Sequence, residues 1–178
     1  MKLLLHICCA PCSIECINEL KDKNIDITGF WYNPNIHPFT EYKNRLNAVK
    51  RYSEDINLKV VYKDQYGLLD FTKNVINDIN NRCDFCYKTR LEESAKYASD
   101  NGFNVFSTTL LISPYQKHDY IKNICIELSK KYNIEFLYID FRDLFKEGKK
   151  KARELDIYMQ KYCGCIFSEA DRYMNKNK

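Results

Sequence analysis

Three groups of cysteines, widely separated in the sequence, supply the side chains best suited to chemistry. The groups are Cys8-Cys9-Ala10-Pro11-Cys12, Cys83-Asp84-Phe85-Cys86 and Cys163-Gly164-Cys165, and they hold seven of the nine cysteines. Thiolates are soft ligands that select zinc, copper(I) or iron-sulfur clusters, and four of them complete a tetrahedral zinc site or a cubane cluster. Seven thiols exceed one such site. We therefore expect one metal centre assembled from three loops, in which the surplus thiols hold a second metal or act as a redox pair.

The adjacent pair Cys8 and Cys9 favours iron-sulfur over zinc. Side chains of neighbouring residues diverge, which makes this pair awkward for one zinc ion, whereas a larger polynuclear centre can use both thiols. An iron-sulfur centre is therefore the first interpretation, with a zinc site and a thiol–disulfide pair as the alternatives. The remaining cysteines, Cys16 and Cys125, fit better as small buried hydrophobic side chains.

Length and composition indicate a single domain in a reducing compartment. A chain of 178 residues buries roughly two-thirds of its unfolded surface without disulfide bonds. No export signal precedes the cysteines and no apolar run is long enough to cross a membrane, so we expect a cytoplasmic protein without a membrane partner. The net charge of +4 is compatible with an anionic partner, and 14 tyrosines and 10 phenylalanines suit RNA bases. An aromatic core with a solvated charged surface explains the same composition.

Apolar runs and helical spacing alternate along the chain. The expected strands are residues 2–7, 26–32, 58–62, 104–110 and 135–139, and the expected helices are residues 13–23, 39–55, 68–80, 83–100 and 119–132. This alternation predicts an α/β fold with a single Rossmann-like domain over residues 1–178. Its core (1–142) is expected to be a mainly parallel sheet of about five strands with helices on both faces. Residues 143–178 are expected to form a helical extension, helix–turn–helix, that carries the last cysteine pair.

The residues that break these patterns follow the ends of the predicted strands. The first cysteine group follows the first strand, residues 33–37 the second, residues 113–116 the fourth and residues 140–142 the fifth. Because ligands of such sheets bind at the carboxyl ends of the strands, we expect these segments to meet. Cys83 and Cys86 open a predicted helix, whose dipole stabilises thiolates. No glycine-rich phosphate loop occurs in these turns, which disfavours a dinucleotide site.

The same motifs resemble those of a known family, the epoxyqueuosine reductases QueH. The similar motifs are Cys-Cys-Ala-Pro-Cys-Ser at 8–13, Cys-x-x-Cys-Tyr-x-x-Arg-Leu at 83–91, Ser-Pro-Tyr-Gln at 113–116 and Tyr-Cys-Gly-Cys-x-Phe-Ser at 162–168, and they span nearly the whole chain. The resemblance implies a cobalamin-independent enzyme that removes the epoxide oxygen of epoxyqueuosine at the tRNA wobble position to give queuosine, with electrons from an external donor. It also implies a 4Fe-4S cluster and an additional iron. Their implied ligands, in a division that the sequence does not fix, are Cys8, Cys9, Cys12, Cys83, Cys86, Cys163 and Cys165.

For the implied reaction, an open position on iron is expected to polarise the epoxide oxygen. Cys8 and Cys9 are therefore candidate catalytic residues. Asp140, at a strand end, is a candidate ligand of the second metal or a proton carrier. His37 is a candidate proton donor or RNA contact, with mere surface placement as the alternative for a lone loop histidine.

Candidate contacts to substrate or tRNA adjoin these motifs. They are Arg45, Tyr87, Arg90, Ser113, Tyr115, Gln116, Lys149, Lys150, Lys151 and Tyr162. The tyrosines are expected to stack on anticodon-loop bases or, alternatively, to shield the cluster from water. The arginines and lysines are expected to contact phosphates, with a solvated surface as the alternative.

Two other functions fit the same residues. A zinc-stabilised RNA-binding module would use the thiols without catalysis, and an iron-sulfur electron carrier or disulfide reductase would use them without RNA. Iron with acid-labile sulfide in the purified protein would favour the enzyme, and zinc alone would favour the module.

Overall fold

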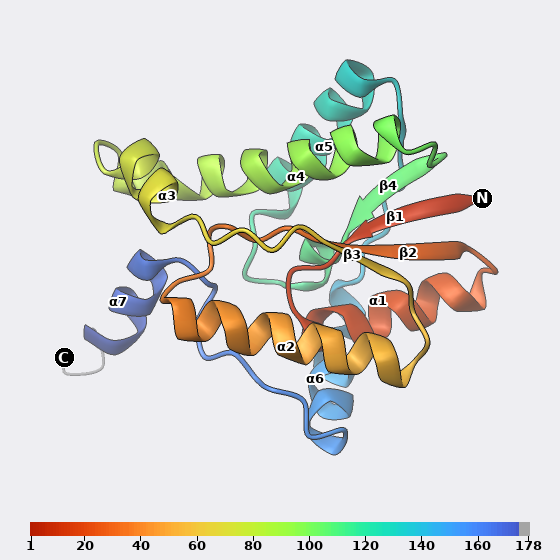
Figure 1. Ribbon diagram of the computed structural model, residues 1–178, viewed down its shortest axis with the longest axis horizontal. Coiled ribbons are helices and arrows are strands. Elements are labelled where there is room, and N and C mark those ends of the chain that lie inside the picture. Colours follow the sequence, from red (N-terminus) through yellow and green to blue (C-terminus); the bar gives the residue numbers. More distant parts are fainter. Residues whose placement is uncertain (175–178) are drawn as a thin grey trace.

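A parallel sheet of five strands forms the centre of the computed structural model, which describes residues 1–174 (Figure 1). The strands are β1 (Lys2–His6), β2 (Asp26–Trp31), β3 (Val60–Tyr62), β4 (Val105–Thr108) and β5 (Glu135–Phe136). They lie in the order β3-β2-β1-β4-β5, and each neighbouring pair is parallel. The predicted Rossmann-like α/β fold is therefore confirmed. The strand order reverses between β1 and β4, where such sheets bind their ligands.

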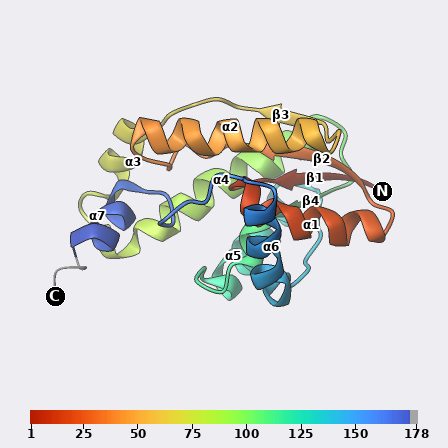
Figure 2. The same cartoon turned by 90° about the horizontal axis from the view of Figure 1, so that it is seen from below.

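Helices cover both faces of the sheet. They are α1 (Ala10–Asp22), α2 (Phe39–Asp55), α3 (Leu68–Val75), α4 (Arg82–Asp100), α5 (His118–Tyr132), α6 (Phe145–Glu154) and α7 (Ile166–Met174). Figure 1 shows α4 and α5 above the sheet and α1, α2 and α6 below it, and Figure 2 looks from below onto the side that α1, α2 and α6 cover. With both faces covered, Leu3, Leu4 and Leu5 of β1 are fully buried, which explains the continuous apolar run. Among the described residues, no helix is long and apolar enough to cross a membrane.

Several boundaries differ from the predicted ones: β3 begins at Val60 instead of residue 58, β5 ends at Phe136 instead of residue 139, and three further differences have a local cause. Helix α1 begins at Ala10 instead of residue 13, because Pro11 suits the first turn of a helix. Strand β4 ends at Thr108 instead of residue 110, because the Thr108 hydroxyl accepts the backbone N–H of Leu110 and turns the chain into a short 3-10 helix (Thr109–Ile112). Helix α3 ends at Val75, before an Asn- and Asp-containing turn whose side chains compete with helical hydrogen bonds.

The C-terminal segment also departs from the predicted helix–turn–helix. After α6 the chain runs without helix or strand through residues 156–165, which we call the C-terminal strap, and then enters α7. The strap returns to the carboxyl ends of the strands and brings Cys163 into the cavity that the first cysteine group lines. In Figure 1, α3 and α7 both lie at the end of the molecule opposite the N-terminus.

Candidate metal centre

The first cysteine group forms a compact cluster of sulfurs at the junction of β1 and α1. The Sγ atoms of Cys8, Cys9 and Cys12 all lie within 4.8 Å of one another, and those of Cys8 and Cys9 are 3.7 Å apart. Thiolates on one tetrahedral metal ion, with metal–sulfur bonds of about 2.3 Å, have sulfurs about 3.8 Å apart. We call these residues the three-thiol group. Its spacing fits a single ion, so the expected divergence of Cys8 and Cys9 is wrong: the chain turns at Cys9, the residue that caps α1.

Neutral side chains hold the three-thiol group in place. The Thr109 hydroxyl accepts the backbone N–H of Cys8 (3.1 Å) and donates to the Cys8 sulfur (3.3 Å). Nε2 of Gln160, from the strap, donates to the Cys9 sulfur at 2.9 Å. Hydrogen bonds from Cys12 and Cys9 lower the pKa of the Cys8 thiol well below its usual value, whereas burial raises the pKa of Cys9. The hydrogen bonds within the group therefore stabilise a thiolate on Cys8.

The other two motifs meet as a second set, the four-thiol group. It consists of Cys83 and Cys86, from the first turns of α4, and Cys163 and Cys165, from the end of the strap. Cys86 and Cys165 are buried together in a small apolar cluster. Burial, opposed by the charge of Arg90 and aided by the charges of Cys163 and Cys165, raises the pKa of Cys86 to about 12. Burial likewise raises the pKa of Cys83, so the expected stabilisation of these thiolates by the helix dipole is outweighed.

A cavity of ≈ 300 Å³ at the carboxyl ends of the strands is lined by the whole three-thiol group and by Cys163 of the four-thiol group. Its lining includes the thiols Cys8, Cys9, Cys12 and Cys163, the amides Asn35, Gln116 and Gln160, and the cations Arg45, Arg90, Lys149 and Lys161. Within the described chain, no carboxylate or imidazole lines this cavity. The structure thus brings the three motifs together as one set of three thiols and one set of four, a division that the sequence left open.

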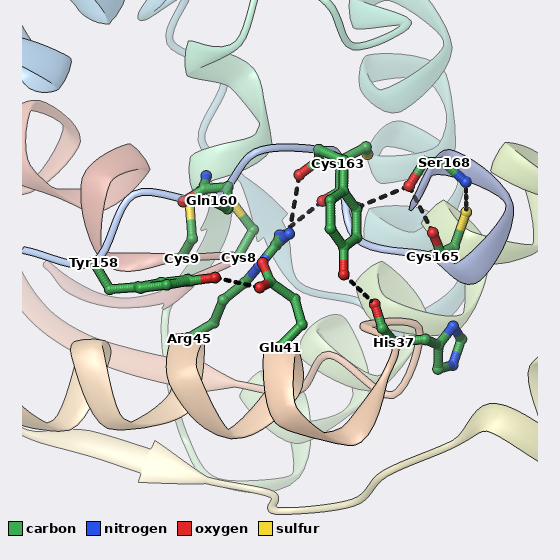
Figure 3. A network of polar contacts seen from close by, with 12 residues as sticks. Cys8, Cys9, His37, Glu41, Arg45, Tyr158, Gln160, Cys163, Cys165 and Ser168 are labelled. Carbon is green, nitrogen blue, oxygen red and sulfur yellow. Dashed lines mark hydrogen bonds and ion pairs between the residues drawn. The ribbon is translucent and has the colours of Figure 1, made fainter. Parts of the chain in front are cut away.

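Arg45 connects the strap to α2. The expectation that its side chain is free to contact phosphate is therefore wrong. Its side chain is 3 % exposed, and its Nε pairs with Glu41 at 2.7 Å. Its two terminal nitrogens donate to the carbonyls of Cys163 (2.7 Å) and Tyr162 (2.9 Å). Tyr158 donates a further hydrogen bond to Glu41. In Figure 3, Glu41 and Arg45 rise from the helix between Cys8 and Cys9 on one side and Cys163 and Cys165 on the other.

Arg90 is also buried, contrary to its expected contact with phosphate. It is 4 % exposed, and it donates to the carbonyl of Cys86 (3.0 Å) and to the Cys86 sulfur (3.1 Å). Arg90 also lines the cavity. Its guanidinium is therefore part of the thiol site itself.

His37 lies in the interior and not on the cavity wall, so its expected exposure to substrate is wrong. Its ring packs against Tyr66 and Phe71, and burial lowers its pKa to about 4. Its Nδ1 accepts the backbone N–H of Ile166 at 3.3 Å, and its own backbone N–H donates to the carbonyl of Gly164 at 2.8 Å. His37 therefore holds the chain around Cys165.

Asp140 is likewise remote from the thiols. Its carboxylate pairs with Arg142 at 2.6 Å, and that hydrogen-bonded guanidinium lowers its pKa to about 2. Neither residue lines the cavity. The expected role of Asp140 as a metal ligand or proton carrier has no support in this placement.

The three lysines of α6 have different surroundings. Lys149 lines the cavity, and its Nζ lies 4.6 Å from the centre of the Phe145 ring. Lys150 lies 3.9 Å from Glu154, and Lys151 pairs with Glu15 at 2.9 Å. Of this basic run, Lys149 alone is placed to meet a ligand of the cavity.

The segment after β4 contributes to both the wall and the mouth of the cavity. Tyr87, buried, donates to Oε1 of Gln116 at 2.5 Å, and Nε2 of Gln116 lies 3.4 Å from the Cys163 sulfur. Ser113, Tyr115 and Tyr162 line the cavity, and Tyr115 is 81 % exposed. Tyr87 therefore orients Gln116, whereas Tyr115 is free for stacking.

Three residues of the site are not among those that the sequence predicts: Glu41, Thr109 and Gln160. Asn35 lies within residues 33–37, the segment expected at this edge of the sheet. Glu41 precedes Arg45 by four residues on a predicted helix, which is the spacing of an ion pair, so a signal existed for it. Thr109 was assigned to a strand interior. Nothing in the sequence marks Gln160.

Comparison with known proteins agrees with these motifs. A family model described as "Epoxyqueuosine reductase QueH" matches residues 3–171. A protein of that name from Dehalococcoides mccartyi is 36% identical over 99% of this chain and 97% of its own length. Another from Thermotoga maritima is 36% identical over 96% of this chain and 91% of its own. The chain belongs to the QueH family.

A solved structure shares the QueH fold at low sequence identity. It is the U34-tRNA thiolase NcsA from Methanococcus maripaludis with its [4Fe-4S] cluster, with a TM-score of 0.60 and 16% identity. The match covers 94% of this chain and 61% of the thiolase. At this identity the likeness establishes the fold alone.

Proposed function

We propose that this chain is an epoxyqueuosine reductase that acts on tRNA in the cytoplasm. The reaction adds two electrons and two protons to the epoxide, releases water and leaves the alkene of queuosine. The observation that carries the proposal is the three-thiol group on the wall of a ≈ 300 Å³ cavity, in a chain of the QueH family. The electrons come from an external donor, because the thiols can supply them only by becoming oxidised.

Each thiol group suits a different iron centre. The four-thiol group offers the number and type of ligands that a 4Fe-4S cluster takes, and the three-thiol group has the spacing of ligands to one additional iron. When bound, these groups supply a Lewis acid for the epoxide oxygen and electrons one at a time, without cobalamin. Positive iron would also offset the burial of the Cys86 thiolate, and its repulsion by the neighbouring thiolates, which together raise the pKa of Cys86.

The chain's own residues account for binding and protonation. Oδ1 of Asn35 and Oε1 of Gln160 are buried without a hydrogen-bond partner and belong to residues that line the cavity. Such oxygens need a donor, which the hydroxyl and amino groups of a modified nucleoside provide. Because no carboxyl or imidazole lines the described cavity wall, the protons for the departing oxygen come from Lys149, Lys161, a tyrosine hydroxyl or bound water.

Anaerobic reconstitution followed by turnover on tRNA that carries epoxyqueuosine tests this function. Changing any one of the seven motif cysteines to Ala should abolish or strongly reduce turnover. Cys125→Ala is the matched control, since Cys125 is buried in α5 outside the motifs. Full activity of a metal-free preparation would refute the proposal, and a colourless protein with zinc alone would favour the RNA-binding module.

A further inference from the structure

Arg90 is a buried cation without a carboxylate partner. Its side chain is 4 % exposed, and none of the ion pairs among residues 1–174 includes it. Arg45, the other buried arginine on the cavity wall, pairs with Glu41. An isolated charge is strongly disfavoured in a protein interior, so Arg90 requires negative charge from another source.

The groups around Arg90 that can carry negative charge are thiols. Its Nη2 lies 3.1 Å from the Cys86 sulfur, and the charges of Cys86, Cys163 and Cys8 all act on its guanidinium. These sulfurs belong to both thiol groups. Arg90 thus lies where the three-thiol and four-thiol groups approach each other.

The orientation of the guanidinium is fixed by its own helix. Nε of Arg90 donates to the carbonyl of Cys86, four residues earlier in α4, at 3.0 Å. This bond holds the guanidinium plane so that Nη2 meets the sulfur of the same residue. The Tyr87 ring, whose centre lies 5.9 Å from the guanidinium carbon, packs beside it. Because these contacts already fix the Arg90 side chain, it reorganises little when the charge on the sulfur changes.

We infer that Arg90 is a positioning residue that raises the reduction potential of the iron-sulfur centre held by the four-thiol group, an inference that rests on the proposed function. Adding an electron makes such a centre more negative. A fixed positive charge and an N–H bond to a ligand sulfur stabilise the reduced form more than the oxidised form. Arg90 thereby makes the cluster easier for an external donor to reduce.

Redox titration of the reconstituted protein, followed by electron paramagnetic resonance, tests this role. In Arg90→Gln, which lacks the charge, the ratio of reduced to oxidised cluster at a fixed potential should fall at least tenfold, equivalent to about 59 mV for one electron. Arg90→Lys retains the charge but lacks the planar guanidinium with its fixed N–H donors. Its ratio of reduced to oxidised cluster should lie between those of Arg90→Gln and the wild type. The matched control is Lys88→Gln, because Lys88 is an exposed cation on the same helix that pairs with Asp84. Its ratio should equal that of the wild type.

A measurement on the unmutated protein covers the case in which the variants lose the cluster. Wild-type protein labelled with ¹⁵N-arginine should show, in the pulsed resonance spectrum of the reduced cluster, the strong nitrogen coupling of a guanidinium bonded to a ligand sulfur. Arg90 makes such a bond to Cys86, whereas Arg45 contacts Cys163 through its carbonyl. If no coupling is seen, or if a loaded Arg90→Gln variant keeps the wild-type potential, the role of Arg90 is overturned. If the wild-type protein itself assembles no iron-sulfur centre, it is the proposed function that fails.

Discussion

At the scale of single residues, the site depends on neutral hydrogen-bond donors as much as on cysteines. Thr109 is fully buried, and its hydroxyl makes two hydrogen bonds to Cys8, one to the backbone N–H and one to the sulfur. Because its oxygen accepts the backbone N–H of Cys8, its proton is left to point at the Cys8 sulfur. This bond favours the thiolate and fixes its direction. Hydrogen bonds of this kind to metal ligands typically affect metal affinity by about 10- to 100-fold.

Thr109 therefore predicts a measurable effect on metal retention. Thr109→Val has nearly the same shape but no hydroxyl, and it should weaken binding of iron(II) by the three-thiol group by about tenfold or more. Thr109→Ser keeps the hydroxyl and should stay close to the wild type. Competition with a calibrated chelator measures both. Equal retention in all three proteins would show that the hydroxyl has no part in holding the metal.

His6 links the carboxyl ends of three strands beneath the thiols. Its Nε2 lies 3.3 Å from the Tyr32 carbonyl, which can only accept, so Nε2 carries the proton. Nδ1 must then accept from the Thr108 hydroxyl, 2.9 Å away. Burial lowers the pKa of His6 from 6.5 to about 4, so the folded protein resists a proton that the unfolded chain takes up.

Acid should therefore destabilise the fold through His6. The contribution of His6 to the free energy of unfolding is highest above pH 6.5 and falls as the pH drops towards 4. Below pH 4 this contribution no longer changes. The two pKa values differ by about 2.5, which is worth roughly 3 kcal/mol. Urea titrations of metal-free wild type and His6→Gln across this range measure the difference. Between pH 6.5 and 4, the free energy of unfolding should fall less in His6→Gln than in the wild type, by roughly this amount. Parallel pH profiles of the two proteins would contradict the lowered pKa of His6.

At the scale of elements, α2 acts as the support for the strap. One face of this helix carries Glu41 and Arg45, which bind Tyr158, Tyr162 and Cys163 through side chains and carbonyls. Glycine suits position 164 beside this contact, because its φ of +157° is a backbone conformation that residues with a side chain rarely adopt. The position of Cys163 and Cys165 thus depends on a buried ion pair that belongs to another element.

Removing this support should release the four-thiol group. Arg45→Met removes the cation that pairs with the buried Glu41 carboxylate, and breaking such a pair destabilises a protein by about 3 to 5 kcal/mol. Acid-labile sulfide per chain should fall sharply after anaerobic reconstitution. Lys43→Met, on the same helix, is the control, because Lys43 is an exposed partner of Asp64. Wild-type sulfide content in Arg45→Met would mean that the strap holds its place without α2.

The sequence determines the elements better than the contacts between them. The run Leu3-Leu4-Leu5 identifies a strand buried on both faces, and the rule for parallel sheets places the first cysteine group at the ligand-binding edge. The division of the seven thiols depends on where the strap returns, and residues 156–165 have no periodic pattern from which to predict it. Arg45 and Arg90 look like surface cations in a sequence because their neutralising partners come from elsewhere in the fold or are themselves thiols.

At the scale of the whole molecule, the strand order concentrates the unusual residues in one place. The reversal between β1 and β4 opens a cavity that receives Cys8 and Thr109 from the two strand ends, and the strap closes one side of it. Tyr115 stands at the mouth with its ring against Phe145, and Lys149 lies over that same ring. An exposed tyrosine that contacts a half-buried phenylalanine, with a cation beside them, suits an unpaired base and its phosphate. The mouth is therefore the expected contact with the anticodon loop.

Lys149 should carry the salt-dependent part of tRNA binding at this mouth. Neutralising one phosphate contact lowers the slope of log affinity against log salt by about 0.7 to 0.9, so Lys149→Gln should flatten the slope by that amount. Lys150→Gln removes the same charge one residue later, beside Glu154 and outside the cavity lining, and should leave the slope unchanged. Tyr115→Ala should weaken binding by about 1 to 3 kcal/mol at every salt concentration, because stacking releases no counterions. Equal slopes for the two lysine variants would place the tRNA backbone elsewhere on the surface.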